Sequence, residues 1–184
     1  MIGGVVLAAG ASTRAGTIKA LVPIDEETFV ARAIRALREG GCDEVVVVVG
    51  PPHAERVAAA IGDAARVDNP RPERGMLSSL KLGLSDDWDA AIVSLVDHPR
   101  VSPSTVRVLI EAWRRGDAEV LRPRHEGESG HPILIARTVF AALRLADDAA
   151  GARPVLASRR RDDVDVDDPF IHEDLDTKDA IRRS

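Results

Sequence analysis

The chain has 184 residues, with 25 basic and 30 acidic side chains and a formal net charge of −5. This length suits a single domain, residues 1–184. The acidic balance argues against nucleic acid and against a membrane surface as partners, because both attract a basic footprint. The single cysteine, Cys42, excludes an intramolecular disulfide and cysteine-based metal clusters. No apolar run approaches the ~20 residues of a membrane helix, and the first residues lack an export signal. We therefore expect a soluble, cytoplasmic protein.

Apolar segments of strand length alternate with helical patterns up to Gly116. Four near-continuous apolar or β-branched runs are typical of strands buried on both faces: Val5–Ala9, Glu44–Val49, Arg66–Asn69 and Ala90–Val96. Between and after them, apolar residues recur three or four positions apart, which predicts helices over Phe29–Glu39, Ala54–Ile61, Leu77–Leu84 and Ser104–Arg115. This alternation indicates an α/β fold in which helices cover a parallel sheet.

The pattern changes after Gly116. Three shorter segments predict further strands around a polar loop, Pro123–Gly130: Val120–Leu121, His131–Ala136 and Val164–Val166. We interpret them as an extension of the sheet that faces a substrate. A short final helix is expected over Lys178–Arg182.

The segment from Leu7 to Lys19 combines the end of the first strand with small residues, glycines and two cations. Gly10 and Gly16 permit close backbone approach, and backbone N–H groups bared in such a loop bind anions. Arg14 can fork onto phosphate oxygens, and Lys19 supplies a compact positive charge. The spacing fits neither a Walker A loop nor a dinucleotide fingerprint. It favours a loop around a nucleoside triphosphate; the alternative is an ordinary strand-to-helix turn with solvated cations.

Asp97 follows the fourth predicted strand. Because ligands bind beyond the carboxyl ends of the strands in open parallel sheets, Asp97 and the glycine loop are expected to share one edge. A carboxylate that faces phosphates is suited to Mg²⁺, although Asp97 could instead form an Asx-turn before Pro99. Asp174 and Asp176 alternate onto one face of an extended segment and could complete the site, unless Asp176 or Thr177 caps the final helix.

Two further segments supply candidate binding residues. A loop that starts at Asn69 opens a helix, where Gly75 permits close approach and Ser78 and Ser79 offer N–H groups and hydroxyls to a base or a phosphate. As a plain capping loop, it needs no function. His131 begins a strand and is either a substrate contact or a half-buried structural histidine. The histidines show no zinc-ligand spacing, so a zinc enzyme is not expected.

Five of these segments, in order, match the pattern of the MobA-like nucleotidyltransferases. That pattern is Leu-Ala-Ala-Gly-x-Ser-x-Arg-Met-Gly-x-x-Lys, Asn-x(5)-Gly-Met-x-x-Ser-Leu, Asp-x-Pro, Gly-His-Pro and Asp-x-Asp-Thr. It stands here at Leu7–Lys19, Asn69–Leu80, Asp97–Pro99, Gly130–Pro132 and Asp174–Thr177. Most of all, the chain resembles the molybdenum cofactor cytidylyltransferase branch. The resemblance covers nearly the whole chain and implies a three-layer α/β/α, Rossmann-like nucleotidyltransferase fold with a mostly parallel central sheet.

The resemblance also implies roles for individual residues. Arg14, Lys19 and Asp97 would be catalytic: the two cations bind the triphosphate, and Asp97 holds Mg²⁺ together with Asp174 or Asp176. His131 would contact the acceptor, and the nucleotide-binding residues would be Leu7, Ala8, Ala9, Gly10, Arg14, Lys19, Asn69, Gly75, Ser78 and Ser79. The Leu-Ala-Ala-Gly form of the motif is associated with CTP. The sequence departs from the family pattern at two places. Ala15 replaces the usual methionine, and the turn at Asp25–Glu27 lacks the usual glycine and adds negative charge near the triphosphate loop.

These residues suit nucleotidyl transfer, in which an acceptor phosphate attacks the α-phosphorus and expels pyrophosphate. Such a reaction needs positioning and charge neutralisation rather than a covalent nucleophile. We therefore expect Mg²⁺-dependent transfer of CMP from CTP to a phosphorylated acceptor, by resemblance molybdopterin, with a molybdoenzyme or its chaperone as a further partner. The rivals are transfer to a sugar or alditol phosphate, and a non-catalytic module that binds nucleotide and delivers molybdenum cofactor.

Overall fold

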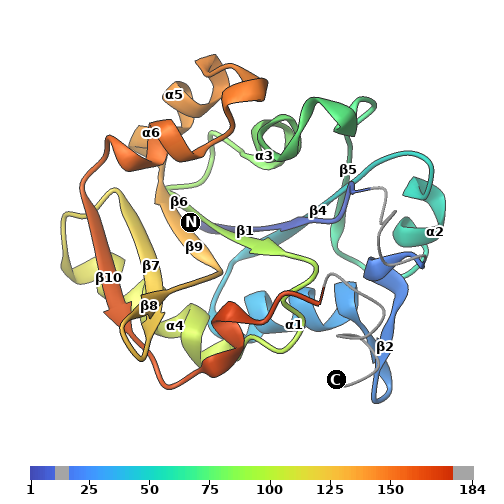
Figure 1. Cartoon of the computed structure of the whole chain (residues 1–184), viewed down its shortest axis with the longest axis horizontal. Helices are drawn as coiled ribbons and strands as arrows, with labels where there is room; N and C mark the ends of the chain where they lie inside the picture. The colour runs from blue at the N-terminus through green and yellow to red at the C-terminus, as the bar shows by residue number, and fades with distance from the viewer. Residues whose placement is uncertain (11–16, 176–184) are drawn as a thin grey trace.

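The computed structural model describes residues 1–10 and 17–175. Its central sheet contains β1 (Ile2–Leu7), β4 (Glu44–Val49), β5 (Ala65–Asp68), β6 (Ala90–Leu95), β7 (Val120–His125), β8 (Glu128–Ser129), β9 (Ile133–Ala136) and β10 (Arg161–Asp165). The strand order is β10-β7-β9-β6-β1-β4-β5, and β8 pairs with β7 (Figure 1). β1 runs parallel to β4 and β6, whereas β9 is antiparallel to both of its neighbours. The predicted mostly parallel sheet is therefore confirmed.

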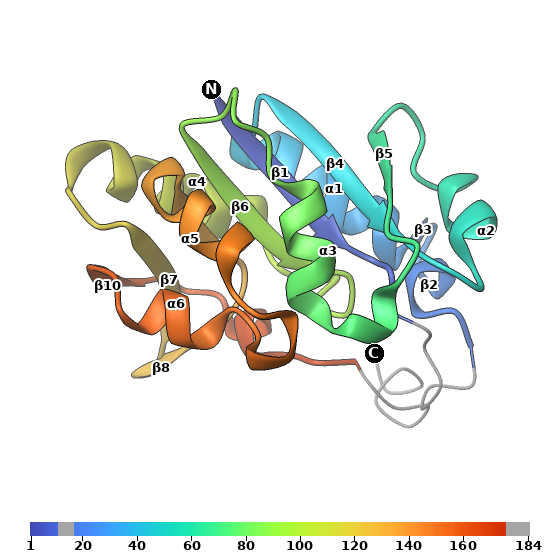
Figure 2. The same cartoon turned by 90° about the horizontal axis from the view of Figure 1, so that it is seen from above.

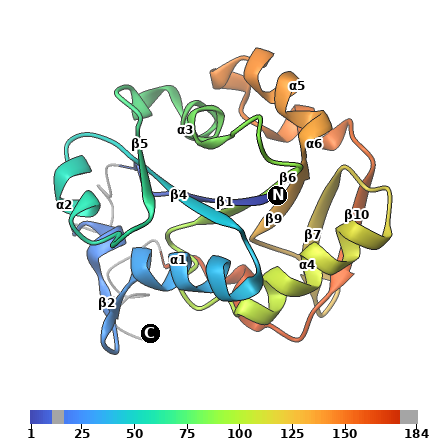
Figure 3. The same ribbon diagram turned by 180° about the vertical axis from the view of Figure 1, so that it is seen from behind.

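Helices cover both faces of this sheet. α1 (Phe29–Gly40) and α4 (Pro103–Arg115) lie side by side on one face (Figure 3). The other face carries α3 (Met76–Gly83), α5 (Phe140–Leu145) and α6 (Arg153–Ala157) (Figure 2), and α2 (Ala54–Ala58) lies near the β5 edge. Each face has its own apolar cluster, because successive side chains of β1 point to opposite sides: Val6 faces α1, while Val5 and Leu7 face α3. The predicted three-layer α/β/α arrangement is confirmed. Within the described residues, no helix combines the length and hydropathy required to cross a bilayer.

The first strand begins at Ile2, earlier than the predicted start at Val5. Gly3 obscured this start because glycine is depleted in strands. Here it is required, since a Cβ on Gly3 would lie 2.0 Å from a ring atom of Trp88. The indole of Trp88 is buried, and its Nε1 donates to Glu44 at 2.8 Å. A glycine in this strand therefore makes room for a core tryptophan.

The prediction of a polar loop over Pro123–Gly130 is wrong. β7 continues to His125, and a turn at Glu126 and Gly127 leads into β8. Both turn residues have positive φ, 50° and 89°, as a two-residue type I′ hairpin requires. The polar residues remain in a strand because arginines of β7 form ion pairs with aspartates of β10 across the parallel pair.

This turn supports a stability prediction. At φ 50°, Glu126 occupies the left-handed region, which asparagine adopts more readily than glutamate. The substitution Glu126→Asn is therefore expected to stabilise the protein by roughly 0.5–1 kcal/mol. Urea denaturation measures the change, and Glu128→Asn, in the adjoining strand, is the control without such a gain. A lower midpoint for Glu126→Asn than for the parent protein would refute this account of the turn.

Candidate active site

A cavity of about 300 Å³ opens at the carboxyl ends of β1 and β6. Leu7 of β1 is in register with Leu95 of β6, so the segments that follow the two strands leave the sheet side by side. The predicted shared edge is therefore confirmed. Most of the predicted nucleotide-binding residues line the cavity together with Asp97: Leu7, Ala8, Ala9, Gly10, Lys19, Gly75 and Ser79.

Lys19 and Asp97 form an ion pair inside this cavity. The distance from Lys19 Nζ to Asp97 Oδ2 is 3.2 Å, and the two side chains are 12% and 21% exposed. Among the described residues, Asp97 Oδ1 is buried and has no hydrogen-bond partner, and Oδ2 accepts from Lys19 Nζ rather than from a backbone N–H, so no Asx-turn is observed there. Leaving a buried charged oxygen unsatisfied is costly. This oxygen therefore fits a hard divalent cation, which prefers carboxylate ligands.

The segment after β10 returns to Asp97 and brings Asp174 with it. The backbone N–H of Leu175 donates to the carbonyl oxygen of Asp97 at 3.1 Å. The other predicted metal ligand, Asp176, lies outside the described residues, as does Arg14. Within residues 1–10 and 17–175, no group of three or more His, Cys, Asp or Glu side chains could hold a metal ion.

The loop before α3 is shaped by Asn69, which is buried and does not line the cavity. Its Nδ2 donates to the hydroxyls of Ser78 and Ser79, at 2.9 Å each, and its Oδ1 accepts from the N–H of Arg71. Gly75 has a φ of 102° and carries the chain from the 3₁₀ helix η2 (Pro72–Arg74) into α3. Asn69 and Ser78 therefore hold the loop together, whereas Gly75 and Ser79 face the cavity.

A second cavity, of about 580 Å³, adjoins the first and shares three apolar side chains with it. His131, the predicted acceptor contact, lines this second cavity. Its backbone N–H donates to the carbonyl oxygen of Ile171 in η5 (Pro169–His172). A Cβ on Gly130 would lie 2.3 Å from that same oxygen, so glycine is required where this segment meets η5. Much of the remaining wall is apolar, and its cationic side chains are Arg122, Arg153 and Arg161.

The rings of His98 and His131 lie close together, with their centroids 5.3 Å apart. Burial lowers the pKa of both rings, and the pKa of His131 falls to about 4 because the neighbouring His98 adds to this effect. Both side chains are therefore neutral at pH 7. They offer a substrate hydrogen-bonding nitrogens rather than positive charge.

The neutral His131 is expected to make stability depend on pH. Its pKa is about 4 in the folded protein, against an ordinary value of 6.5, so the unfolded chain binds the proton first as the pH falls. The stabilisation is complete above pH 6.5 and is lost towards pH 4; at pH 5 the loss is on the order of 2 kcal/mol. Urea unfolding at pH 7 and pH 5 should show a smaller pH effect in His131→Gln. Equal losses in the variant and the parent would exclude His131 as the source.

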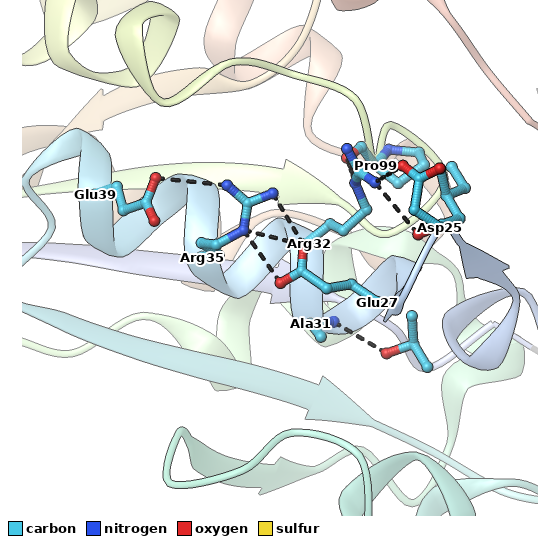
Figure 4. Close-up of polar contacts among 9 residues, drawn as sticks. Asp25, Glu27, Ala31, Arg32, Arg35, Glu39 and Pro99 are labelled. Carbon is cyan, nitrogen blue, oxygen red and sulfur yellow. Dashed lines mark hydrogen bonds and ion pairs between the residues drawn. The ribbon is translucent and has the colours of Figure 1, made fainter.

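The acidic turn lies in a separate hairpin of β2 (Pro23–Ile24) and β3 (Glu27–Thr28), and two of its three carboxylates, Asp25 and Glu27, are paired with arginines of α1 (Figure 4). Arg35 Nη2 lies 3.0 Å from Glu27 Oε2, and Arg32 Nη1 lies 3.1 Å from Asp25 Oδ2. Arg32 Nε also donates to the carbonyl oxygen of Pro99 at 3.3 Å, so it ties the hairpin to the loop after β6. Asp25 has a φ of 53°, a conformation that glycine adopts readily. Ion pairing therefore offsets much of the negative charge expected from this turn.

Several residues near the cavities were not predicted. His98 and Met76 stand next to recognised residues, so their position in the motifs could have indicated them. Arg32 reaches the loop after β6 from another element, and Asp148 pairs with Arg74 and Lys81 across the fold. Arg32 and Asp148 are far in the sequence from these partners, so no local spacing could have predicted the contacts.

The fold and the first cavity define an α/β protein with a cavity at the carboxyl edge of its parallel strands. The model of the MobA-like NTP transferase domain matches residues 4–164. The chain therefore belongs to the MobA-like NTP transferase family, a family of nucleotidyltransferase enzymes.

Individual relatives cover nearly the whole chain. Nicotine blue oxidoreductase from Paenarthrobacter nicotinovorans is 34% identical, over 98% of this chain and 94% of the relative. Molybdenum cofactor cytidylyltransferase from Escherichia coli (strain K12) is 25% identical, over 95% and 91%. Other relatives are named probable molybdenum cofactor guanylyltransferases.

A solved structure extends this similarity to three dimensions. Rv0371c from Mycobacterium tuberculosis H37Rv superposes with a TM-score of 0.86 at 31% identity, over 99% of this chain and 95% of that one. Its complex with manganese gives a TM-score of 0.81 at 28% identity, over 99% and 96%.

Proposed function

We propose that this protein transfers a nucleotidyl group, preferably CMP from CTP, to a phosphorylated acceptor of the molybdopterin type, with Mg²⁺ as its metal. The observation that carries this proposal is the ion pair of Lys19 and Asp97 in the first cavity, where Asp97 Oδ1 has no hydrogen-bond partner among the residues that the structure describes. The relative named as a molybdenum cofactor cytidylyltransferase supports the choice of nucleotide and acceptor. A molybdoenzyme or its chaperone would receive the product.

The chemistry joins an oxygen of the acceptor phosphate to the α-phosphorus and breaks the bond to pyrophosphate. Lys19, with Arg14, would place positive charge against the triphosphate, and the backbone after β1 and at Gly75 would border the nucleotide. An ionised phosphate needs no general base. Mg²⁺, held by Asp97 with Asp174 or Asp176, would neutralise charge on the phosphate oxygens. The manganese complex of Rv0371c supports a divalent ion in this fold.

The second cavity is proposed as the acceptor site. It adjoins the first, so an acceptor phosphate can reach the nucleotide without leaving the protein. Its apolar wall suits a flat ring system, and its arginines suit anionic groups. The neutral ring of His131 can hydrogen-bond to a ring nitrogen or oxygen of the acceptor.

Pyrophosphate release with each of the four nucleoside triphosphates, Mg²⁺ and molybdopterin tests the proposal. We expect CTP to give the fastest release, and removal of the divalent ion to stop it. Faster turnover with sugar or alditol phosphates would assign the acceptor to that class instead. Nucleotide binding without turnover for any pair would contradict the enzymatic proposal and favour a non-catalytic module that delivers molybdenum cofactor.

The similarity to nicotine blue oxidoreductase favours a second candidate function, an oxidoreductase reaction on a small organic molecule. The apolar wall of the second cavity suits the apolar part of such a molecule. Bleaching of nicotine blue in the presence of NADH or NADPH tests it. Bleaching that depends on the protein, together with no pyrophosphate release, would replace the transferase proposal.

A further inference from the structure

The 3₁₀ helix η4 (Asp148–Ala150), which follows α5, carries a carboxylate that two cations enclose. The side chain of Asp148 is 7% exposed, and its Oδ2 lies 2.8 Å from Arg74 Nη2. Its Oδ1 lies 2.6 Å from Nζ of Lys81 on α3. Lys81 holds the pKa of this carboxyl below its ordinary value. Asp148 is therefore ionised at neutral pH and joins η4 to both η2 and α3.

The same residue contacts the segments that border the two cavities. Arg74 immediately precedes Gly75, which lines the first cavity, and the carbonyl oxygen of Asp148 lies 3.6 Å from the Cβ position of Gly75. That oxygen also accepts from the N–H of Gly151 at 3.1 Å. Gly151 lines the second cavity together with Arg153. One residue thus holds the edge of each cavity.

We propose that Asp148 is a positioning residue that couples the two cavities, so that restraining the backbone at Gly75 also restrains the backbone at Gly151. The carboxylate fixes Arg74 on one side, and the backbone of the same residue fixes Gly151 on the other. A displacement of either segment must therefore be shared by the other or must break a contact of Asp148, which is the ion pair with Arg74 on one side and the hydrogen bond from Gly151 on the other. The identity of the two ligands rests on the proposed function, whereas the coupling itself does not.

Amide hydrogen exchange in the protein without ligand tests the coupling directly. Arg74→Gln removes one arm of the contact at a side chain that is 51% exposed, so the fold should persist. We expect exchange at Gly151 and its neighbour Ala150 to accelerate about tenfold, because the ion pair of Arg74 reaches them through Asp148. Asp148→Asn should accelerate exchange on both sides, at Gly75 and at Gly151.

The matched control is Asp86→Asn. Asp86 forms an ion pair of similar length with Arg144 of α5, 2.6 Å, but at the far end of α3. It should leave exchange at Gly75 and Gly151 unchanged. Unchanged exchange at Gly151 in both Arg74→Gln and Asp148→Asn would overturn the proposal, and so would equal acceleration in the control.

Addition of CTP and Mg²⁺ separates this proposal from the proposed function. In the parent protein, CTP should slow exchange at Gly75 and also at Gly151, whereas in Asp148→Asn only Gly75 should respond. A response at Gly151 that survives in Asp148→Asn would overturn the coupling. If CTP slows exchange nowhere, the nucleotide proposal fails, while the ligand-free comparison still decides whether the segments are coupled.

Discussion

Asp97→Asn is expected to lower kcat by about 10³-fold or more, because it weakens the ligand proposed to hold the metal and removes its negative charge. The substitution keeps the size of a side chain that is only 21% exposed, so the fold should remain. Steady-state pyrophosphate release at saturating CTP measures the loss, and circular dichroism checks the fold.

Asp89→Asn is the matched control for Asp97→Asn. Asp89 also forms ion pairs, with Arg137 and the amino terminus of the chain, but it lies at the opposite ends of the strands. The Asp89→Asn variant should have the same kcat as the parent protein. Parental kcat in Asp97→Asn would remove Asp97 from the active site.

Lys19→Met should lower kcat by about 10²- to 10³-fold while changing the affinity for CTP much less. A charge that acts mainly on the transition state is lost from kcat, whereas a charge that only binds the triphosphate is lost from KM. Methionine retains most of the length of the side chain. Initial rates over a range of CTP concentrations separate the two parameters.

A pure KM effect would make Lys19 a binding residue only. The double variant Asp97→Asn/Lys19→Met adds a second check. The two side chains are in contact, at 3.2 Å, so their effects should not add. Strictly additive losses would indicate that the two residues act independently.

The architecture could be predicted from the sequence where local pattern determines it. Val5 and Val6 belong to a continuous apolar run because β1 is buried on both faces. Such a run predicts a buried strand even when the elements that pack against it are not known. The start of the strand could not be predicted, because Gly3 is explained only by Trp88 packing on it from far along the chain. The sequence wrongly predicts a loop over Pro123–Gly130 for a similar reason, since arginines of this region pair with aspartates of β10 that lie far along the chain.

The candidate site shows the same division. Asp97 could be placed beside the glycine loop because topology brings the carboxyl ends of parallel strands to one edge. The structural role of Asn69, which holds together the loop before α3, could not be predicted. The sequence does not show that its amide donates to two serine hydroxyls rather than to a ligand. Arg32 and Asp148 act through partners from other elements, so no motif could indicate them.

A crystal structure with CTP and Mn²⁺ would test the central claim most directly, because manganese is located by its anomalous scattering. We predict the ion beside Asp97 Oδ1 and the triphosphate within hydrogen-bond distance of Lys19 Nζ, in the cavity at the ends of β1 and β6. Nucleotide and metal bound elsewhere, with the pair of Lys19 and Asp97 unchanged, would contradict it.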